Sequence, residues 1–201
     1  MIITSIKQQV KNPDRASLFI DGKYSFSLSL NELVTEKLKI NQEIDEPGLK
    51  RLKKISDDGK LKARALEWVL NRPRSTRELK NYLYHRKTED ETAEAIIDYL
   101  QSRGYVDDRS FAIWLIDVRT RSGKSSRMIE NELQKKGVKR EIINDLLSSD
   151  SSGEVDKIVT IINKKSKISR YKNDEIRLKQ YLLRQGFNYE DIKTALTKQQ
   201  L

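Results

Sequence analysis

Two adjacent aspartates, Asp107 and Asp108, are the side chains of this sequence that come nearest to a pair of working carboxylates. They lie in GYVDDRSFA (residues 104–112), between a glycine–aromatic pair and an apolar run. A catalytic carboxyl pair needs a facing group, a pocket and a raised pKa, and the sequence supplies none of these around it. The spacing suits a helix start, with Asp107 as the N-cap and with Val106 and Phe111 packing across it. We therefore expect the two aspartates to begin a helix.

Other candidates for chemistry are weaker. SGKSS (residues 122–126) ends like a phosphate-binding loop, but a valine stands where the motif needs its first glycine, and helical spacing precedes it. His85 is the single histidine and the chain has no cysteine, which excludes thiolate and multi-histidine metal sites. The sequence thus predicts a protein that is not an enzyme, with no catalytic residue, metal site or cofactor. A metal-dependent nuclease that uses Asp57, Asp58 and the aspartate pair above is a minor alternative.

The first 47 residues predict a small β element. Alternating residues in ASLFI (16–20) and KYSFSLSL (23–30) flank an Asp-Gly turn, which is typical of a two-residue hairpin. One face of the second strand is expected to hold Tyr24, Phe26, Leu28 and Leu30. Ser29 and Glu32 have capping-box spacing, so a helix is expected to begin there, and a Pro-Gly pair is expected to close the element. So short a chain makes a weak core by itself, and we expect it to dock on the helical remainder of the chain.

The rest of the chain repeats itself three times, with a period a little under 50 residues. Each unit contains three amphipathic helical segments, and matching apolar residues recur in the first and second of them. The matched sets are Leu66, Ala112 and Ile158; Val69, Leu115 and Ile161; Leu79, Ile129 and Leu178; and Leu83, Leu133 and Leu182. Repeats of this length indicate stacked units that bury their apolar faces against one another. We predict a mainly α fold, with three tandem three-helix repeats behind a small N-terminal β-hairpin and helix.

Composition agrees with a helical chain, because Gly (8) and Pro (3) are scarce while Leu, Lys and Glu abound. The expected organisation is a β-rich extension (1–47), a linker helix (48–60) and three-helix repeats over 61–103, 104–148 and 149–201. The chain shows neither a signal peptide nor the roughly 18 apolar residues of a membrane span. We therefore expect a cytoplasmic protein without membrane association.

Charge is distributed unevenly along the chain. Residues 1–48 hold 6 Lys/Arg against 7 Asp/Glu, whereas residues 49–201 hold 34 against 23, so the net charge of +10 belongs to the repeats. A field of this sign attracts polyanions, namely nucleic acid, an acidic membrane or an acidic protein surface. A solvated surface without a partner is the alternative.

The positive charge is concentrated between the first and second helices of every repeat. The twelve cations there are Arg72, Arg74 and Arg77; Arg119, Arg121, Lys124 and Arg127; and Lys164, Lys165, Lys167, Arg170 and Lys172. Equivalent loops of a stacked array emerge on the same side, so we expect these cations to form one basic ridge. Such a ridge fits an extended anion, either duplex DNA or a helical nucleoprotein filament. Arg and Lys on loops suit phosphate or carboxylate contacts better than base reading.

Several stretches resemble the RecX family of recombination regulators. The resemblance runs through about residues 60–197, is most specific in GYVDDRSFA and ELQKKGV, and includes the N-terminal LFIDGKYSFSL. It implies tandem three-helix units in a curved, elongated monomer that binds the RecA protein, lies along the groove of the RecA–DNA filament and restrains it. RecA ATP hydrolysis, strand exchange and co-protease activity would then fall, which would affect DNA repair and the SOS response. The family provides no catalytic residues to carry over.

Two functions stay open on this basis. The first is a non-catalytic modulator, and most simply an inhibitor, of the RecA filament. The second is an independent, sequence-nonspecific DNA-binding protein. The salt dependence of duplex binding separates them, because neutralised phosphates release counterions.

Overall fold

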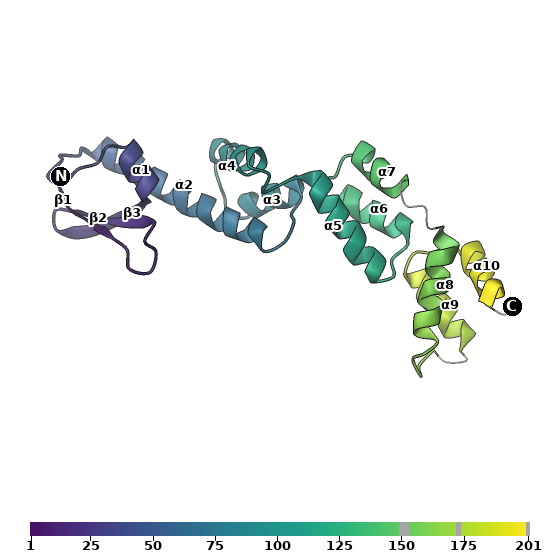
Figure 1. Cartoon of the computed structure of the whole chain (residues 1–201). Helices are drawn as coiled ribbons and strands as arrows, with labels where there is room; N and C mark the ends of the chain where they lie inside the picture. Colours follow the sequence, from purple (N-terminus) through teal and green to yellow (C-terminus); the bar gives the residue numbers. More distant parts are fainter. Residues whose placement is uncertain (149–152, 172–173, 200–201) are drawn as a thin grey trace. The chain divides into compact units, whose positions relative to one another are not determined.

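The computed structural model describes residues 1–148, 153–171 and 174–199 (Figure 1). Three strands come first: β1 (Ile3–Gln8), β2 (Arg15–Ile20) and β3 (Lys23–Ser29). The helices after them are α1 (Leu30–Thr35), α2 (Glu46–Leu70), α3 (Thr76–Tyr84), α4 (Asp90–Ser102), α5 (Asp108–Arg121), α6 (Ser126–Lys135), α7 (Arg140–Ser148), α8 (Glu154–Lys165), α9 (Glu175–Arg184) and α10 (Tyr189–Gln199). The fold is mainly α with a small N-terminal sheet, which confirms the predicted class. Within the described ranges, no helix combines the length and apolar composition that crossing a bilayer requires.

The chain divides into two compact units, Met1–Trp68 with Glu89–Ile96 and Val69–Thr88 with Ile97–Leu201. The first unit holds the sheet, with order β1-β2-β3 and antiparallel pairing of neighbours. The chain turns between β2 and β3 at Asp21 and Gly22, whose φ values of 49° and 83° confirm the predicted Asp-Gly turn. The core beside the sheet is formed by Ile3, Leu18, Ile20, Phe26, Leu28, Ile44 and Leu52.

The predicted apolar face of β3 is partly wrong. The two middle residues of the predicted set are buried, whereas Tyr24 is 56% exposed and Leu30 is 40% exposed. An extra residue in β3, Ser25, shifts the pairing with β2 and turns Tyr24 to the other face of the sheet. There its ring meets that of Phe19, with ring centroids 6.0 Å apart. Leu30 has already left the strand and begins α1.

The sheet docks on α2, as expected from its small size. The predicted capping box opens α1. The Pro-Gly pair expected to close the N-terminal element lies instead in the first turn of α2, where proline is tolerated because that turn's N–H groups lack helical partners. Asp45 accepts a hydrogen bond from the N–H of Gly48 there, at 2.9 Å. Further along this 25-residue helix, the hydroxyl of Ser56 donates to the carbonyl of Ser27 in β3, at 2.7 Å.

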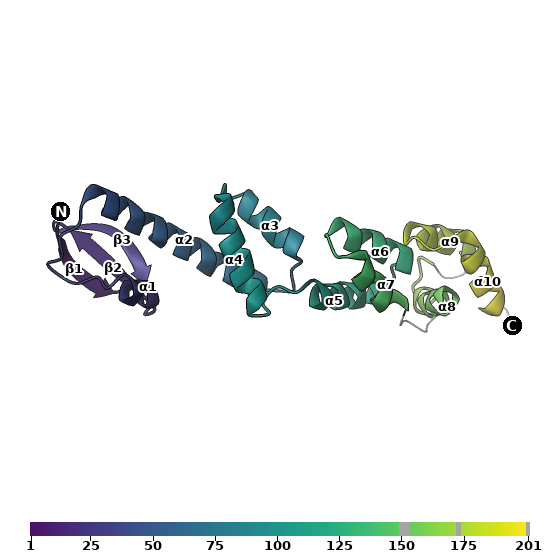
Figure 2. The same cartoon turned by 90° about the horizontal axis from the view of Figure 1, so that it is seen from above.

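The second unit contains the later repeats, in which α5, α6 and α7 form one group of helices and α8, α9 and α10 another (Figure 2). Helices α5, α6 and α7 enclose one apolar cluster, and α8, α9 and α10 enclose another. The second helices α3, α6 and α9 bury equivalent pairs of side chains, namely Leu79 and Leu83, Ile129 and Leu133, and Leu178 and Leu182. For the second helices, the period found in the sequence therefore corresponds to equivalent buried positions. In the first helices the match is only partial, because Leu66 and Ile161 are half-buried whereas their predicted counterparts are buried.

The aspartate pair begins a helix, as predicted. Asp107 is the N-cap of α5 and accepts a hydrogen bond from the N–H of Ser110 at 2.6 Å. Val106 and Phe111, which were expected to pack across the cap, are both buried. The hydrogen bond from Ser110 also lowers the pKa of Asp107, as expected for a carboxylate at the positive end of a helix.

Successive repeats in the second unit share one kind of contact. The carboxylate of Asp108, at the start of α5, accepts a hydrogen bond from the N–H of Thr76, at the start of α3, at 2.8 Å. The carboxylate of Glu154, at the start of α8, accepts one from the N–H of Ser126, at the start of α6, at 3.1 Å. Each acid thus lies at the positive end of the second helix of the preceding repeat. Asp108 therefore joins two repeats, a task beyond the expected helix start.

The turns after α6 and α9 complete this contact. The hydroxyl of Ser75 donates to the carbonyl of Lys136 after α6, at 2.7 Å. The N–H of Ser125 donates to the carbonyl of Gln185 after α9, at 3.0 Å. We call these junctions the α3–α6 contact and the α6–α9 contact.

Candidate functional site

Six of the twelve predicted cations lie on helices rather than in connectors. Arg119 and Arg121 occupy the last turn of α5, and Lys164 and Lys165 occupy the last turn of α8. Cations at these positions offset the negative end of the helix dipole, so part of this charge stabilises the helices. The other two helical cations are Arg77 in α3 and Arg127 in α6. The cations in the connectors themselves are Arg72, Arg74, Lys124, Lys167 and Arg170, while Lys172 lies outside the described residues.

Two of the arginines are held in bidentate ion pairs. Both terminal nitrogens of Arg72 donate to the carboxylate of Glu78, at 3.0 Å each. Nε and Nη2 of Arg119 donate to the carboxylate of Glu132, at 2.7 Å each. The Arg119 guanidinium holds the pKa of Glu132 below its ordinary value. Paired hydrogen bonds between ions are strong and directional. Arg72 and Arg119 therefore each join the first connector or first helix of a repeat to the second helix of the same repeat.

The first connector also serves the α3–α6 contact. Lys136 donates to the carboxylate of Glu78 at 2.7 Å. Burial alone would raise the pKa of Glu78, but the hydrogen bonds from Arg72 and Lys136 hold it below its ordinary value. Arg77 donates to the carbonyl of Lys135 at 3.3 Å. Arg72 and Arg77 are therefore engaged within the protein, on the side that faces the next repeat.

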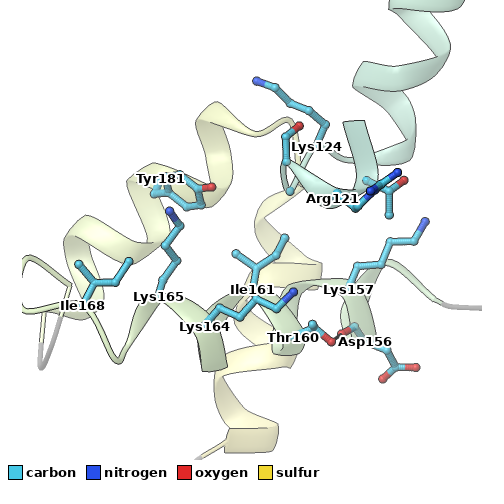
Figure 3. Close-up of a pocket in the computed structure, with 13 residues that line it drawn as sticks. Arg121, Lys124, Asp156, Lys157, Thr160, Ile161, Lys164, Lys165, Ile168 and Tyr181 are labelled. Atoms are coloured by element: carbon cyan, nitrogen blue, oxygen red, sulfur yellow. Dashed lines mark hydrogen bonds between the residues drawn. The ribbon is translucent and has the colours of Figure 1, made fainter. Parts of the chain in front are cut away.

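The second connector and helix α8 enclose a cavity, which is the candidate site (Figure 3). Its volume is about 620 Å³, within the range of ligand pockets. The lining residues are Thr120, Arg121, Ser122, Gly123, Lys124, Asp156, Lys157, Thr160, Ile161, Lys164, Lys165, Ile168 and Tyr181. Five of these are cations and one is a carboxylate, so the cavity attracts anions. We call it the basic cavity.

The basic cavity brings together four of the twelve predicted cations, Arg121, Lys124, Lys164 and Lys165. The described candidates that lie outside it are Arg72, Arg74, Arg77, Arg119, Arg127, Lys167 and Arg170. Arg74 differs from the exposed cations because burial lowers its pKa. The basic cavity thus contains only some of the cations predicted for the ridge, and these belong to the second and third repeats.

Sequence reasoning missed the face of α8 that lines the basic cavity. Lys157, Ile161 and Lys164 recur at spacings of four and three residues in α8, which places them on one side of the helix. Ile168 follows in the turn after α8. Among them, Lys164 was predicted as a binding cation and Ile161 only as a repeated apolar position. The mixed cationic and apolar stripe was the signal that could have found the others.

Three of the five cations in the basic cavity already have partners. Arg121 forms an ion pair with Asp117, one turn earlier in α5. Lys157 donates to a serine hydroxyl at the start of α6, at 2.9 Å. The ammonium group of Lys165 lies 4.7 Å from the ring centroid of Tyr181, a cation–π contact. The contacts of Lys157 and Lys165 hold these two side chains in the cavity wall, whereas the Arg121 ion pair is exposed to solvent.

Lys124 and Lys164 are the cations available to a ligand. Figure 3 shows Lys124 on the second connector and Lys164 on α8. Lys124 is half-buried and Lys164 is exposed. In the part of the chain that the structure describes, neither ammonium group forms a close ion pair, although the charge of Lys124 contributes to lowering the pKa of Glu132. Both can therefore neutralise charge on a bound anion.

The aspartates that the nuclease alternative would use lie in surroundings that fit a structural role. The pKa of Asp107 is lowered, whereas a general acid needs it raised. Burial raises the pKa of Asp58, which accepts a hydrogen bond from Thr92 at 3.4 Å. Within the ranges that the structure describes, no group of three or more His, Cys, Asp or Glu side chains could hold a metal ion. The arrangement suits the binding of an anionic partner.

Comparisons with known proteins give consistent results. The family model described as "Regulatory protein RecX N-terminal domain" matches residues 1–45, and that described as "RecX, second three-helix domain" matches residues 107–147. A protein named Regulatory protein RecX from Bacillus licheniformis is 34% identical, over 96% of this chain and 76% of the relative. Another of that name from Clostridium beijerinckii is 28% identical, over 98% of this chain and 94% of the relative.

Two solved structures are also similar to this one. A crystal structure of regulatory protein RecX aligns over 98% of both chains with a TM-score of 0.71, at 21% identity, and supports the fold alone. A crystal structure of RecX from Lactobacillus salivarius aligns over 71% of this chain and 96% of that chain, with a TM-score of 0.56 and 26% identity. The helical fold found here is therefore one that other proteins with this name adopt.

Proposed function

Because the chain belongs to the RecX family, we propose that it is a non-catalytic regulator of the RecA recombinase. It binds RecA and the RecA–DNA filament, lies along the filament groove, and inhibits the recombinase, ATPase and co-protease activities. Binding alone is sufficient, because an array that contacts neighbouring RecA subunits biases the filament between its states without any reaction on a substrate. In this proposal the protein acts in the cytoplasm as a monomer and needs no cofactor.

The basic cavity is the observation that carries this proposal. A filament of protein and DNA presents carboxylates and phosphates along its length, and Lys124 and Lys164 are placed to neutralise such groups. Arg72 and Arg119 contribute less, because their guanidinium groups are bound to carboxylates of the same repeat. We therefore propose that recognition is concentrated on the second and third repeats rather than spread over twelve equal cations.

RecA ATP hydrolysis on single-stranded DNA tests the proposal, with the protein titrated up to stoichiometric ratios. Hydrolysis should fall as the protein is added. The double variant Lys124→Glu, Lys164→Glu should need about tenfold more protein or greater for the same inhibition, because charge-assisted contacts contribute roughly 1.5–3 kcal/mol each. Undiminished hydrolysis with the unmodified protein would exclude the proposed function.

The matched control is the double variant Arg140→Glu, Lys193→Glu. It makes the same change in net charge at exposed positions of α7 and α10, outside the basic cavity. It should inhibit nearly as well as the unmodified protein. Equal losses in the two double variants would mean that inhibition depends on overall charge and not on the cavity.

Arg119 is unsuitable for such a charge reversal. A glutamate at this position would face the carboxylate of Glu132, which now accepts both hydrogen bonds of the ion pair. Two carboxylates at this spacing repel each other and would disturb the packing of α5 on α6. A loss of inhibition would then report on folding and not on recognition.

Direct, sequence-nonspecific DNA binding is the second candidate, and the same basic cavity favours it. If about five phosphates are neutralised, the slope of log affinity against log salt for duplex DNA should be near −4 to −5. Such a slope, with equal affinity for naked duplex and for the filament, supports the DNA-binding protein. A flat response for duplex, with filament binding retained, supports the RecA regulator.

A further inference from the structure

The basic cavity has an apolar floor as well as cationic walls. Ile161 and Tyr181 are half-buried in it, and Ile168 is 46% exposed. Gly123, with a φ of 80°, brings the connector against this floor: a Cβ there would lie 3.4 Å from Cδ1 of Ile161 and 3.5 Å from the hydroxyl of Tyr181. A simple anion would leave the apolar floor exposed to water. A ligand with an apolar group between two anionic groups would cover it and gain from both kinds of contact.

We propose that the basic cavity binds an acidic peptide segment that carries one aliphatic or aromatic anchor residue. The anchor lies on Ile161 and Ile168, and carboxylates on either side of it pair with Lys124 and Lys164. This inference deepens the proposed function and rests on it for the use of the cavity. It names the chemistry of the protein segment that the cavity recognises.

The carboxylate in the cavity lining opposes an acidic ligand only in part. Asp156 forms an ion pair with Lys198 of α10, with 3.6 Å between nitrogen and oxygen. Its charge is thus partly balanced from within the third repeat. The field that an incoming carboxylate meets is set by the cations of the connector and of α8.

Stacking of a nucleobase on Tyr181 is the competing interpretation, and the surroundings of the ring disfavour it. The ammonium group of Lys165 lies 4.7 Å from the centroid of this ring. The ring of Tyr171 meets it edge-on, with centroids 5.7 Å apart and an interplanar angle of 62°. A base would have to displace the cation and lose its contact with the ring before it could stack. A carboxylate-bearing peptide leaves this arrangement intact.

Fluorescence anisotropy with labelled probes and the whole chain tests the inference. The first probe is a short peptide of Asp and Glu around a single Leu, the second has Ser in place of the Leu, and the third is an oligothymidylate of equal charge. The Leu peptide should bind about tenfold more tightly than the Ser peptide, because burial of an aliphatic side chain contributes at least that factor. It should also bind more tightly than the oligothymidylate.

A pair of exposed isoleucines provides the matched variants. Ile168→Ser removes apolar surface from the cavity and should abolish most of the advantage of the Leu peptide over the Ser peptide. Ile113→Ser removes a similar side chain from α5, where it is 51% exposed and lies outside the cavity. That variant should keep the full advantage. Because both side chains are exposed, both variants should fold.

Equal affinity for the Leu and Ser peptides would overturn the inference, and so would tighter binding of the oligothymidylate. RecA ATP hydrolysis, measured in parallel, separates this failure from that of the proposed function. If hydrolysis falls while the two peptides bind equally, the peptide inference alone is wrong. If the Leu peptide binds as expected while hydrolysis is undiminished, the peptide inference stands and regulation of RecA is wrong.

Discussion

Gly186 is the position where one added methyl group should disrupt the α6–α9 contact. Its φ of 91° lies in the left-handed region that favours glycine. A Cβ there would lie 2.6 Å from Oγ of Ser125 and would also collide with the side chain of Met128. Ser125 is the N-cap of α6, and its N–H is bonded to the Gln185 carbonyl at 3.0 Å. Gly186→Ala therefore strains its own backbone and also pushes on the cap of the preceding repeat.

Gly104→Ala is the matched control for this substitution. Its φ is 72°, but a Cβ there would meet nothing within 4 Å. A left-handed backbone costs an L residue roughly 1–2 kcal/mol, so Gly104→Ala should lower the free energy of unfolding by about that amount. At Gly186, overpacking adds roughly 1–3 kcal/mol. Gly186→Ala should therefore lower the free energy of unfolding by about 2–5 kcal/mol.

Urea denaturation followed by circular dichroism measures both losses. Hydrogen exchange locates them: the amide of Ser125 should exchange faster in Gly186→Ala and not in Gly104→Ala, because only the former disturbs its bond to the carbonyl of Gln185. If both substitutions lower the free energy of unfolding equally, and the Ser125 amide is unaffected, the two repeats do not approach as closely as described. The reasoning about the α6–α9 contact would then be refuted.

Asp108→Ala removes the carboxylate bound to the N–H of Thr76 and should lower the free energy of unfolding by about 1–2 kcal/mol, with faster amide exchange at the start of α3; unchanged exchange there would contradict this. Phe111 is 1% exposed, so Phe111→Ala should cost roughly 3–5 kcal/mol in urea denaturation, and a loss below about 1 kcal/mol would be too small for a buried ring. Because the Arg119 ion pair lowers the pKa of Glu132, its contribution to stability is present above the unfolded-state pKa of about 4.3 and is lost as pH falls through the lower folded-state pKa. Glu132→Gln should therefore flatten the decline of the urea midpoint in that acidic range, and an unchanged acid profile would show that the pair does not stabilise the fold.

Features that depend on neighbours in the chain were predictable from the sequence. The N-cap at Asp107, the Asp-Gly turn and the capping box of α1 each involve residues within a few positions of one another. The periodic apolar residues of the repeats also depend on local spacing, because a helix places every third or fourth residue on one face. These are the features that the structure confirms.

Features that depend on partners far along the chain were not predictable in the same way. The face on which Tyr24 lies depends on how β3 pairs with β2, and the extra residue Ser25 cannot be seen in the strand alone. The N–H that Asp108 binds belongs to Thr76, in the preceding repeat. For the cations, the positions of the charges can be read from the sequence, but the carboxylates that form ion pairs with them cannot. Arg119 has such a carboxylate in Glu132, whereas Lys124 and Lys164 of the basic cavity form no close ion pair among the described residues.

One position in the turn after each second helix has a left-handed backbone, and in the later repeats it also packs closely against the preceding repeat. Lys87, Gly137 and Gly186 are equivalent, and their φ values are 55°, 82° and 91°. All three favour glycine for the backbone. Only the latter two turns are packed against an earlier repeat: a Cβ at Gly137 would lie 2.7 Å from Nε of Arg77. The first repeat has no earlier repeat in the chain, which explains why a side chain is tolerated at Lys87.

Under the proposed function, recognition by the basic cavity depends on the α6–α9 contact between repeats. Lys124 directly precedes Ser125, whose N–H is bonded to the Gln185 carbonyl of the third repeat. Lys157 of α8 reaches back to the start of α6 at 2.9 Å, so the connector and α8 are held together by the same junction. The positions of Lys124 and Lys164 on the two sides of the basic cavity are thus set by packing between repeats. The α6–α9 contact has already ordered the backbone at Lys124 and Lys164. A ligand that binds both side chains therefore loses little free energy in ordering that backbone.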